Sequence, residues 1–239
     1  MENNGISRRA FVAAAAFAPV LLKAESADPA AMADRPDHFQ LGIADLDQGV
    51  ALVRDATGVE PAFGGAHPGY GTRNALISLG EGSYLEILAL DPAQADLKTP
   101  RTDRIRALGG PTILTYAMQT TIIERKLALA QEIPGVTGKL DPRSRKKPDG
   151  TTLEWTNLPL ESPFGPQLPF FIDWKGATHP SKTAPAGCKL LSFEVLHPEA
   201  EALRAAYRKL GIGIAVKAAA QPGFVATLGT PKGQVVFVG

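Results

Sequence analysis

One arrangement of elements occurs three times along this chain: a strand, a capped helix that ends at a glycine, and further strands, at a spacing of roughly 75 residues. The first copy begins with the segment 38–43, where Phe39 and Leu41 alternate with polar positions as in a half-buried strand. The second copy begins near Thr112 and the third near Lys189. Because one such unit cannot cover both its helix and its sheet, we expect the units to pack against one another.

The helix of each unit carries a start signal. Asp45 precedes the first helix with Gln48 three residues later, and Gly58 follows its apolar stripe. Thr121 and Glu124 have the same spacing before the second helix. This spacing is typical of a capping box, so it predicts helices that begin just after Asp45 and Thr121.

The segment 64–86 holds the largest concentration of polar side chains beside predicted strands. A glycine-rich loop with His67 leads into Arg73 and Asn74, and a hairpin follows whose second strand carries Glu86. Loops that present polar groups beside rigid strands are common places for binding and catalysis. The segment is therefore the first candidate for a functional site. The alternative is an ordinary hairpin whose loop carries polar residues without a function.

Composition and charge exclude several classes of protein. The formal net charge is +1 over 239 residues, which argues against broad neutralisation of nucleic-acid phosphates. The single Cys188 excludes an intrachain disulfide and a multi-cysteine metal cluster. With 44% hydrophobic residues, the composition is that of a globular protein.

The N-terminus has the features of an export signal. Residues 7–12 read Ser-Arg-Arg-Ala-Phe-Val, an Ala-rich apolar run covers 13–22, and Ala-Met-Ala follows at 31–33. The pattern resembles the twin-arginine signal and predicts a signal peptide over 1–33, with a periplasmic or secreted mature protein. The run is too short to span a bilayer, so no stable membrane insertion is expected after signal removal. The alternative is a disordered arm with a chance arginine pair.

Several stretches together resemble the glyoxalase-like domain proteins of the vicinal oxygen chelate superfamily, which also holds glyoxalases, bleomycin resistance proteins and extradiol dioxygenases. The matching residues are 37–38, 45–47, 64–74, 84–86, 148–150, 168–174 and 179–180. The resemblance implies an α+β fold in which repeated β-α-β-β-β modules form a curled mixed sheet with helices outside. It implies two paired modules over 35–175 and a third over 187–239, packed on the same domain.

The resemblance also implies a metal site. In such folds a histidine on the first strand and a glutamate on the last strand of a module bind a divalent metal, and His38 and Glu86 occupy these positions. Asp173 is the ligand expected from the second module. Zn, Fe, Mn and Ni all suit such ligands, and a metal-free polar pocket remains the alternative. A glutamate on an apolar strand face needs a partner, either a metal or Arg73.

Glu86 and His67 are the candidate catalytic residues. His67 is a ligand, an acid or base, or a loop residue bonded to the backbone. Arg73 and Asn74 suit a carboxylate or enediolate oxygen, or they pin the loop. Tyr116 and Trp174 are further candidates for substrate binding. The aromatic residues Trp155, Phe170, Phe171 and Trp174 line a pocket or belong to the core.

These observations lead to two hypotheses. The chain is an exported glyoxalase-like enzyme, a metal-dependent lyase, isomerase or dioxygenase that acts on a small oxygenated substrate. Alternatively, it is a metal-free protein of the same fold that binds or sequesters a small molecule. A small-molecule ligand is the expected partner in both cases, with no nucleic acid, and a homodimer is the oligomer to test.

Overall fold

A computed structural model describes residues 35–80, 82–146 and 152–239. The expected signal segment 1–33 and turn 148–150 lie outside these residues. In chain order, the strands and α-helices are β1 (His38–Gly42), α1 (Leu46–Thr57), β2 (Ala62–His67), β3 (Thr72–Ser78), β4 (Tyr84–Leu90), α2 (Pro100–Arg106), β5 (Thr112–Gln119), α3 (Ile123–Gln131), β6 (Thr137–Gly138), β7 (Asp141–Lys146), β8 (Thr152–Leu158), β9 (Leu160–Glu161), β10 (Phe170–Asp173), β11 (Lys189–His197), α4 (Ala200–Leu210), β12 (Ala215–Ala218), β13 (Gly223–Thr230) and β14 (Gly233–Val238).

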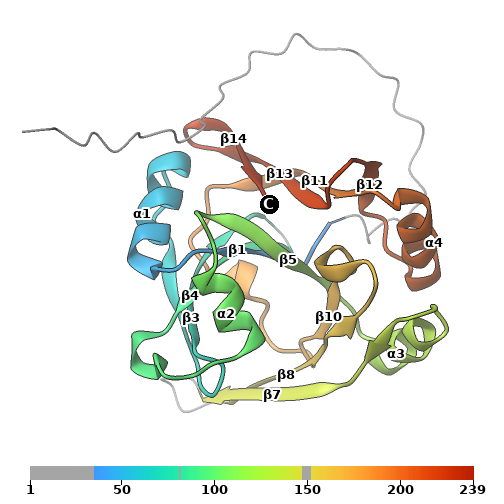
Figure 1. Ribbon diagram of the computed structural model, residues 1–239. Coiled ribbons are helices and arrows are strands. Elements are labelled where there is room, and N and C mark those ends of the chain that lie inside the picture. The colour runs from blue at the N-terminus through green and yellow to red at the C-terminus, as the bar shows by residue number, and fades with distance from the viewer. Residues whose placement is uncertain (1–34, 81, 147–151) are drawn as a thin grey trace, which may run out of the picture.

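Eight strands form one curled sheet in the order β2-β3-β4-β1-β5-β10-β8-β7 (Figure 1). It is mixed, because β1 runs parallel to β4 and β10 runs parallel to β5, while the other neighbouring strands are antiparallel. Its two edges approach each other: the guanidinium carbon of Arg143 on β7 lies 3.9 Å from the ring centre of Tyr70, just after β2. This architecture confirms the predicted α+β fold with a curled mixed sheet.

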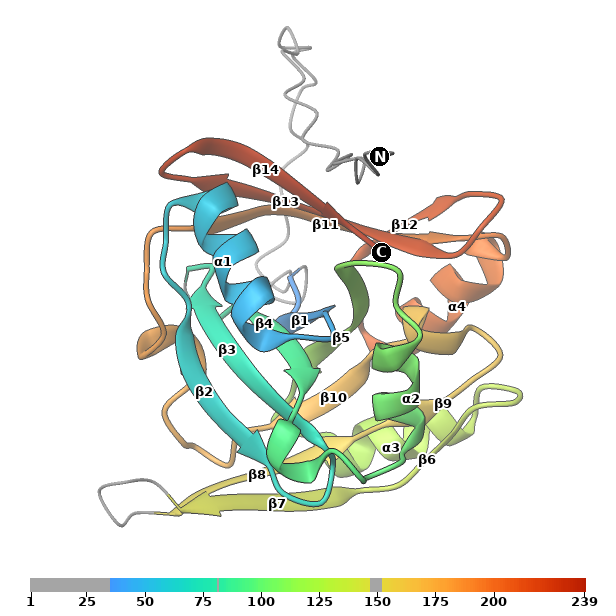
Figure 2. The same cartoon turned by 60° about the vertical axis from the view of Figure 1, so that its left-hand side comes forward.

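The remaining long strands form a second sheet, in the order β12-β11-β13-β14, which lies across one side of the first (Figure 2). Aromatic rings join the two sheets. The ring of Phe193 on β11 lies 5.6 Å from that of Phe39 on β1 and 5.0 Å from that of Tyr116 on β5. These side chains are buried in one large cluster, so both sheets share a single core.

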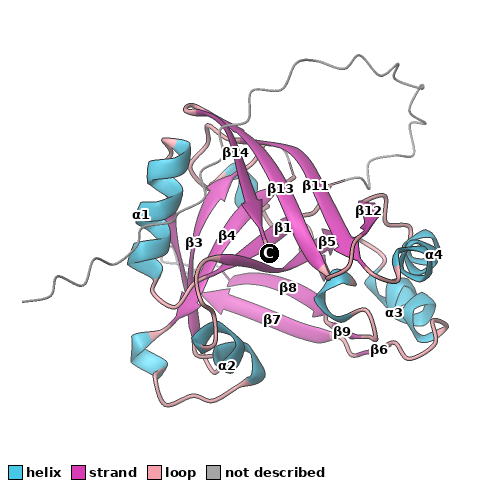
Figure 3. Cartoon of the chain, turned by 45° about the horizontal axis from the view of Figure 1, so that its top comes forward, coloured by secondary structure: helices cyan, strands magenta, loops and turns pink. Residues whose placement is uncertain are grey.

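Helices α1, α3 and α4 lie around the outside of the sheets, and Ile105 of α2 packs against Leu88 of β4 (Figure 3). Asp45 caps α1 as predicted, since its carboxylate accepts the backbone N–H of Gln48 at 3.0 Å, and Gly58 ends the helix with a φ of 80°. The predicted cap at Thr121 is absent: α3 follows Ile122, which makes no side-chain capping bond. Burial of Ile123 against the core sets this start instead.

Strand β1 is more deeply buried than the alternation predicts. All five of its residues are buried, including His38 and Gln40 on the polar face of the predicted half-buried strand. The reason is its place between β4 and β5 in the middle of a curled sheet, where both faces are covered. In the described part of the chain, no helix has the length and apolarity needed to cross a membrane.

Candidate functional site

Glu86 lies near the centre of the curled sheet, on the face that we call the inner face. Along β4, Tyr84, Glu86 and Leu88 point to this face, while Leu85 and Ile87 belong to the core shared with the second sheet. The parallel register pairs Gln40 of β1 with Glu86. The neighbouring strands therefore bring polar side chains to the same face as the carboxylate.

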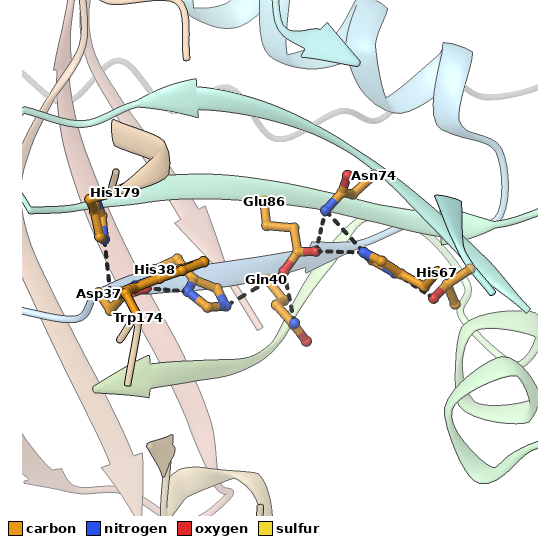
Figure 4. A network of polar contacts seen from close by, with 9 residues as sticks. Asp37, His38, Gln40, His67, Asn74, Glu86, Trp174 and His179 are labelled. Carbon is orange, nitrogen blue, oxygen red and sulfur yellow. Dashed lines mark hydrogen bonds and ion pairs between the residues drawn. The ribbon is translucent and has the colours of Figure 1, made fainter. Parts of the chain in front are cut away.

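Two side-chain amides hold the carboxylate of Glu86 (Figure 4). Nδ2 of Asn74, on β3, donates to Oε1 at 2.7 Å, and Nε2 of Gln40 donates to Oε2 at 2.8 Å. Burial by itself would raise the pKa of Glu86, but the nearby rings of His38 and His67 and the two amide donors outweigh it. The pKa of Glu86 therefore lies below its ordinary value, and the group is a buried, ionised carboxylate.

Two histidines flank this carboxylate on opposite sides (Figure 4). Nε2 of His38 lies 3.6 Å from Oε2 of Glu86, and Nε2 of His67 lies 3.9 Å from Oε1. Both distances exceed that of a hydrogen bond, so the rings approach Glu86 without directly binding it. Each ring has a polar partner on its other nitrogen, which holds it in place.

Asp37 is the partner of His38 and the centre of a second group of contacts. Its Oδ1 lies 2.6 Å from Nδ1 of His38, and its Oδ2 accepts Nε1–H of Trp174 and contacts Nε2 of His179, both at 2.8 Å. Burial opposes ionisation of Asp37, but the hydrogen bonds from His179 and His38 prevail and hold its pKa below the ordinary value. The network runs from His179 through Asp37 and His38 to Glu86.

His67 stands at the end of β2, where the following turn fixes it. Its Nδ1 lies 2.9 Å from Oγ1 of Thr72, and its Nε2 lies 3.3 Å from Nδ2 of Asn74. The side-chain amide of Gln94 accepts the N–H of Gly69 at 2.7 Å and donates to the carbonyl of His67 at 3.2 Å. A quarter of the His67 side chain (25%) is exposed, against 4% for His38, so His67 is the member of the group that solvent reaches.

The structure thus brings together four predicted site residues, His38, His67, Asn74 and Glu86, and connects Trp174 to them through Asp37. It separates the other three, Arg73, Tyr116 and Asp173, from the inner face.

Arg73 alternates with Asn74 along β3 and shares its strand face with the buried Ala75 and Ile77, so it points away from Glu86. Arg73 is therefore not the partner of Glu86. This corrects one of the two predicted alternatives. Asp173 forms an ion pair with Lys175 at 2.9 Å and shares a face of β10 with Phe171. It is directed away from the histidines because its position is one residue out of phase with the inner face.

Tyr116 belongs to the core instead of the inner face. Its hydroxyl contacts that of Tyr207 on α4, and the Tyr207 hydroxyl donates to the carbonyl of Gln167 at 2.5 Å. Burial raises the pKa of Tyr116 well above its ordinary value, and the contact with Tyr207 adds to this effect. Its hydroxyl contact joins β5 to α4.

Sequence reasoning missed Asp37, Gln40 and Gln94 as members of the site. Gln40 could have been predicted from the sequence, because it stands two residues after His38 and therefore lies on the same strand face. Asp37 stands next to His38 in the sequence, but its partners Trp174 and His179 are more than 130 positions away (137 and 142). No local pattern marks such contacts.

The side chains around Glu86 do not converge as ligands of the expected divalent metal would. Both oxygens of Glu86 already accept an amide hydrogen, and the two histidines approach different oxygens instead of one common point. Within 35–80, 82–146 and 152–239, no three or more His, Cys, Asp or Glu side chains are grouped so as to hold a metal ion. A catalytic metal usually takes about three converging protein ligands, so these residues do not form a ready metal centre.

Comparison with known proteins places the chain in a family. The model of the glyoxalase-like domain family matches residues 37–211. A hypothetical protein from Staphylococcus aureus superposes with a TM-score of 0.57 at 18% identity, over 85% of this chain and 84% of that chain. This likeness supports the fold alone.

Two further structures are similar at TM-scores below 0.5. Methylmalonyl-CoA epimerase from Mycobacterium tuberculosis has a TM-score of 0.40 at 16% identity, covering 58% of this chain and 85% of that chain. A mutant of 4-hydroxymandelate synthase from Streptomyces coelicolor has 0.48 at 14% identity, covering 86% and 62%. No curated protein matched the sequence. The family match covers well over half of the chain, so this protein belongs to the glyoxalase-like domain family.

Proposed function

We propose that this protein is an exported glyoxalase-like enzyme that binds a small oxygenated molecule at the inner face and moves a proton to or from it through Glu86. One observation carries the proposal: a buried carboxylate is held in place by two amides and flanked by two histidines. Ionisation makes Glu86 a proton acceptor at neutral pH, and its rigid support suits a general base.

The surrounding residues have distinct roles in this proposal. Asn74 and Gln40 orient the carboxylate, and Asp37 orients the ring of His38 through Nδ1. Nε2 of His38 and Nε2 of His67 lie beside the two oxygens of Glu86, so both rings are placed to bind an oxygen that gains charge when a neighbouring carbon loses its proton. Removal of such a proton is the first step of many isomerase and lyase reactions, which are the reaction types we propose.

A metal-dependent form of the enzyme, including a dioxygenase, requires a different arrangement of the same residues. Glu86 would have to lose its hydrogen bond to Asn74 or Gln40. The ring of His38 or His67 would have to turn toward the same metal position as the freed oxygen. Metal analysis of protein purified without chelator tests this form, because a stoichiometric metal that is lost in a His38→Ala variant would support it.

A sequestering protein is the second candidate function. It is favoured by the same two amide bonds, because they already satisfy part of the carboxylate's hydrogen-bonding capacity without a substrate. Such a protein would bind its ligand at the inner face and release it unchanged.

Proton exchange with solvent separates these functions. The chelator-treated protein is incubated in D2O with 2-hydroxyacetophenone or hydroxyacetone, and NMR follows deuterium entry at the carbon beside the carbonyl. We expect exchange above the buffer rate and a loss of about a hundredfold or more in Glu86→Gln, as for removal of a general base.

The matched control is Glu194→Gln, which changes a glutamate on β11 that pairs with Lys217 in the second sheet. This variant should exchange at the original rate. Equal exchange by Glu86→Gln and the original protein would overturn the proposed chemistry. Saturable binding without exchange would support the sequestering function.

A further inference from the structure

A group of apolar side chains lies on the inner face beside the polar network, separate from the main core. We call it the inner-face cluster. Its buried members include Tyr84, Leu153, Ile172 and Trp174, and partly buried side chains pack against them, among them Leu76, Trp155 and Phe170. These residues come from β3, β4, β8 and β10 and from the residue that follows β10. The cluster therefore extends across the curl of the sheet.

Packing on the two faces of the sheet differs. On the core face, Phe39 is 0% exposed, and Phe171 is 1% exposed. On the inner face, Trp155 and Phe170 are only partly buried, although both are large and aromatic. Partly exposed aromatic side chains inside a curled sheet are typical of the wall of a small-molecule site.

This apolar surface directly adjoins the polar network. The ring of His38 stacks on Tyr84 with centroids 4.5 Å apart and meets the edge of Phe170 at 5.4 Å. Trp174 joins the two parts as well, because it contacts Trp155 at 6.1 Å and donates to Asp37. Phe170 is therefore separated from Glu86 by the ring of His38, and Trp155 connects to the same network through Trp174.

Charges near this surface disfavour an acidic ligand. Glu86 and Asp37 are ionised carboxylates, and Arg73 lies on the opposite strand face. Arg143 on β7 shares a face with Trp155, its partner in the register, but it pairs with Asp141 and stacks on Tyr70. A ligand carboxylate here would lie beside the carboxylates of Glu86 and Asp37, whereas Arg73 points away and Arg143 is paired with Asp141.

Glu86 can accept further hydrogen bonds. Each carboxylate oxygen has two lone pairs, and each takes one amide hydrogen, from Asn74 or from Gln40. The histidine nitrogens at 3.6 and 3.9 Å leave the remaining positions to a ligand. The head group that fits is therefore a hydrogen-bond donor.

We propose that the inner face binds a small aromatic molecule with a neutral hydroxyl head, its ring against Phe170 and Trp155 and its hydroxyl donating to Glu86. The proposal names the ligand class of the site described above and rests on the proposed function for the use of that site. It excludes arenecarboxylates, which Arg73 and Asn74 would have suited if both had faced the ligand.

The chain supplies its own probe, because its only two tryptophans, Trp155 and Trp174, both lie at the inner-face cluster. Tryptophan fluorescence is titrated with benzyl alcohol, benzoate and toluene, which share the ring and differ in the head group. We expect saturable quenching by benzyl alcohol and binding about tenfold weaker for toluene and benzoate, the loss expected when a hydrogen bond to a charged group is absent.

Two variants check the assignment. Glu86→Gln should bind benzyl alcohol about tenfold more weakly and should reduce its preference over benzoate, whereas Glu194→Gln should bind like the original protein. Thermal melting establishes that each variant is folded, and calorimetry on a Trp155→Phe variant measures binding without that reporter. Benzoate binding as tightly as benzyl alcohol, or absence of saturable binding by benzyl alcohol, would overturn the proposal.

The outcome is independent of the exchange experiment. Benzyl alcohol has no acidic C–H beside a carbonyl, so it reports binding alone. Binding with the expected preference and no proton exchange would leave the ligand class standing while the proposed chemistry fails. Exchange with 2-hydroxyacetophenone but no preference for benzyl alcohol would support the proposed chemistry and overturn the proposed ligand class.

Discussion

Nε1–H of Trp174 donates to Oδ2 of Asp37 across 137 positions of sequence, at 2.8 Å. The bond ties the segment after β10 to the residue that precedes β1, and Asp37 in turn holds His38 at 2.6 Å. The carboxylate of Asp37 thus connects the second half of the curled sheet to the ring beside Glu86.

Trp174→Phe should destabilise the fold by about 1–3 kcal/mol, because it leaves an acceptor of a buried charged group without its donor while it keeps an aromatic ring. Urea denaturation measures the change. Trp155→Phe is the matched control on the same face and should cost less. Equal losses in both variants would show that ring size, and not the bond to Asp37, sets the effect.

Stability should fall in acid because of Asp37 and Glu86. Their pKa values are lower in the folded protein than in the unfolded chain, so their contribution is complete above the unfolded values near pH 4 and disappears as pH falls through the folded values. Thermal melting from pH 7 to pH 2.5 tests this. Asp37→Asn should be less stable at pH 7 and should lose less stability in acid. A variant curve parallel to that of the original protein would contradict this assignment.

Gly64 is expected to position Asn74. A Cβ at Gly64 would lie 2.4 Å from Oδ1 of Asn74, so Gly64→Ala must displace the amide that holds Glu86. We expect a cost of about 1–3 kcal/mol in stability and a slower proton exchange. At Gly109 a Cβ would meet nothing within 4 Å, so Gly109→Ala is the control and should change neither quantity. Exchange by Gly64→Ala at the original rate would show that Asn74 adapts.

Tyr207→Phe should reduce stability without affecting ligand binding. It removes the hydroxyl that contacts Tyr116 and donates to Gln167, at an expected cost of about 1–3 kcal/mol. Because Tyr116 faces the core, Tyr116→Phe should likewise leave the affinity for benzyl alcohol unchanged. Titration and denaturation of both variants provide the test, and a weaker affinity in Tyr116→Phe would restore that residue to the ligand site.

Export depends in our proposal on the arginine pair at the N-terminus. A double variant, Arg8→Lys with Arg9→Lys, should remain in the cytosol with its first 33 residues uncleaved, because the twin-arginine route reads the pair itself. Cell fractionation and intact-mass measurement report the outcome. Arg35→Lys, outside the predicted signal, is the control. Unchanged export of the double variant would rule out this route.

Local patterns in the sequence determined much of the framework. Alternation along β4 placed Tyr84, Glu86 and Leu88 on one face, and Asp45 and Gly58 marked both ends of α1, because these features depend on neighbouring residues alone. The predicted start of α3 was wrong, because burial of Ile123 outweighed the capping signal at Thr121.

The site depended on tertiary structure. Gln40 reaches Glu86 because β1 pairs in parallel with β4, although the two residues are 46 positions apart. Asn74, and not Arg73, faces the carboxylate because the register of β3 on β4 assigns each side chain to a face. Polar residues and strand phase can be read from the sequence. Which carboxylate meets which donor is decided by strand pairing, because those contacts join residues that only the folded sheet brings together.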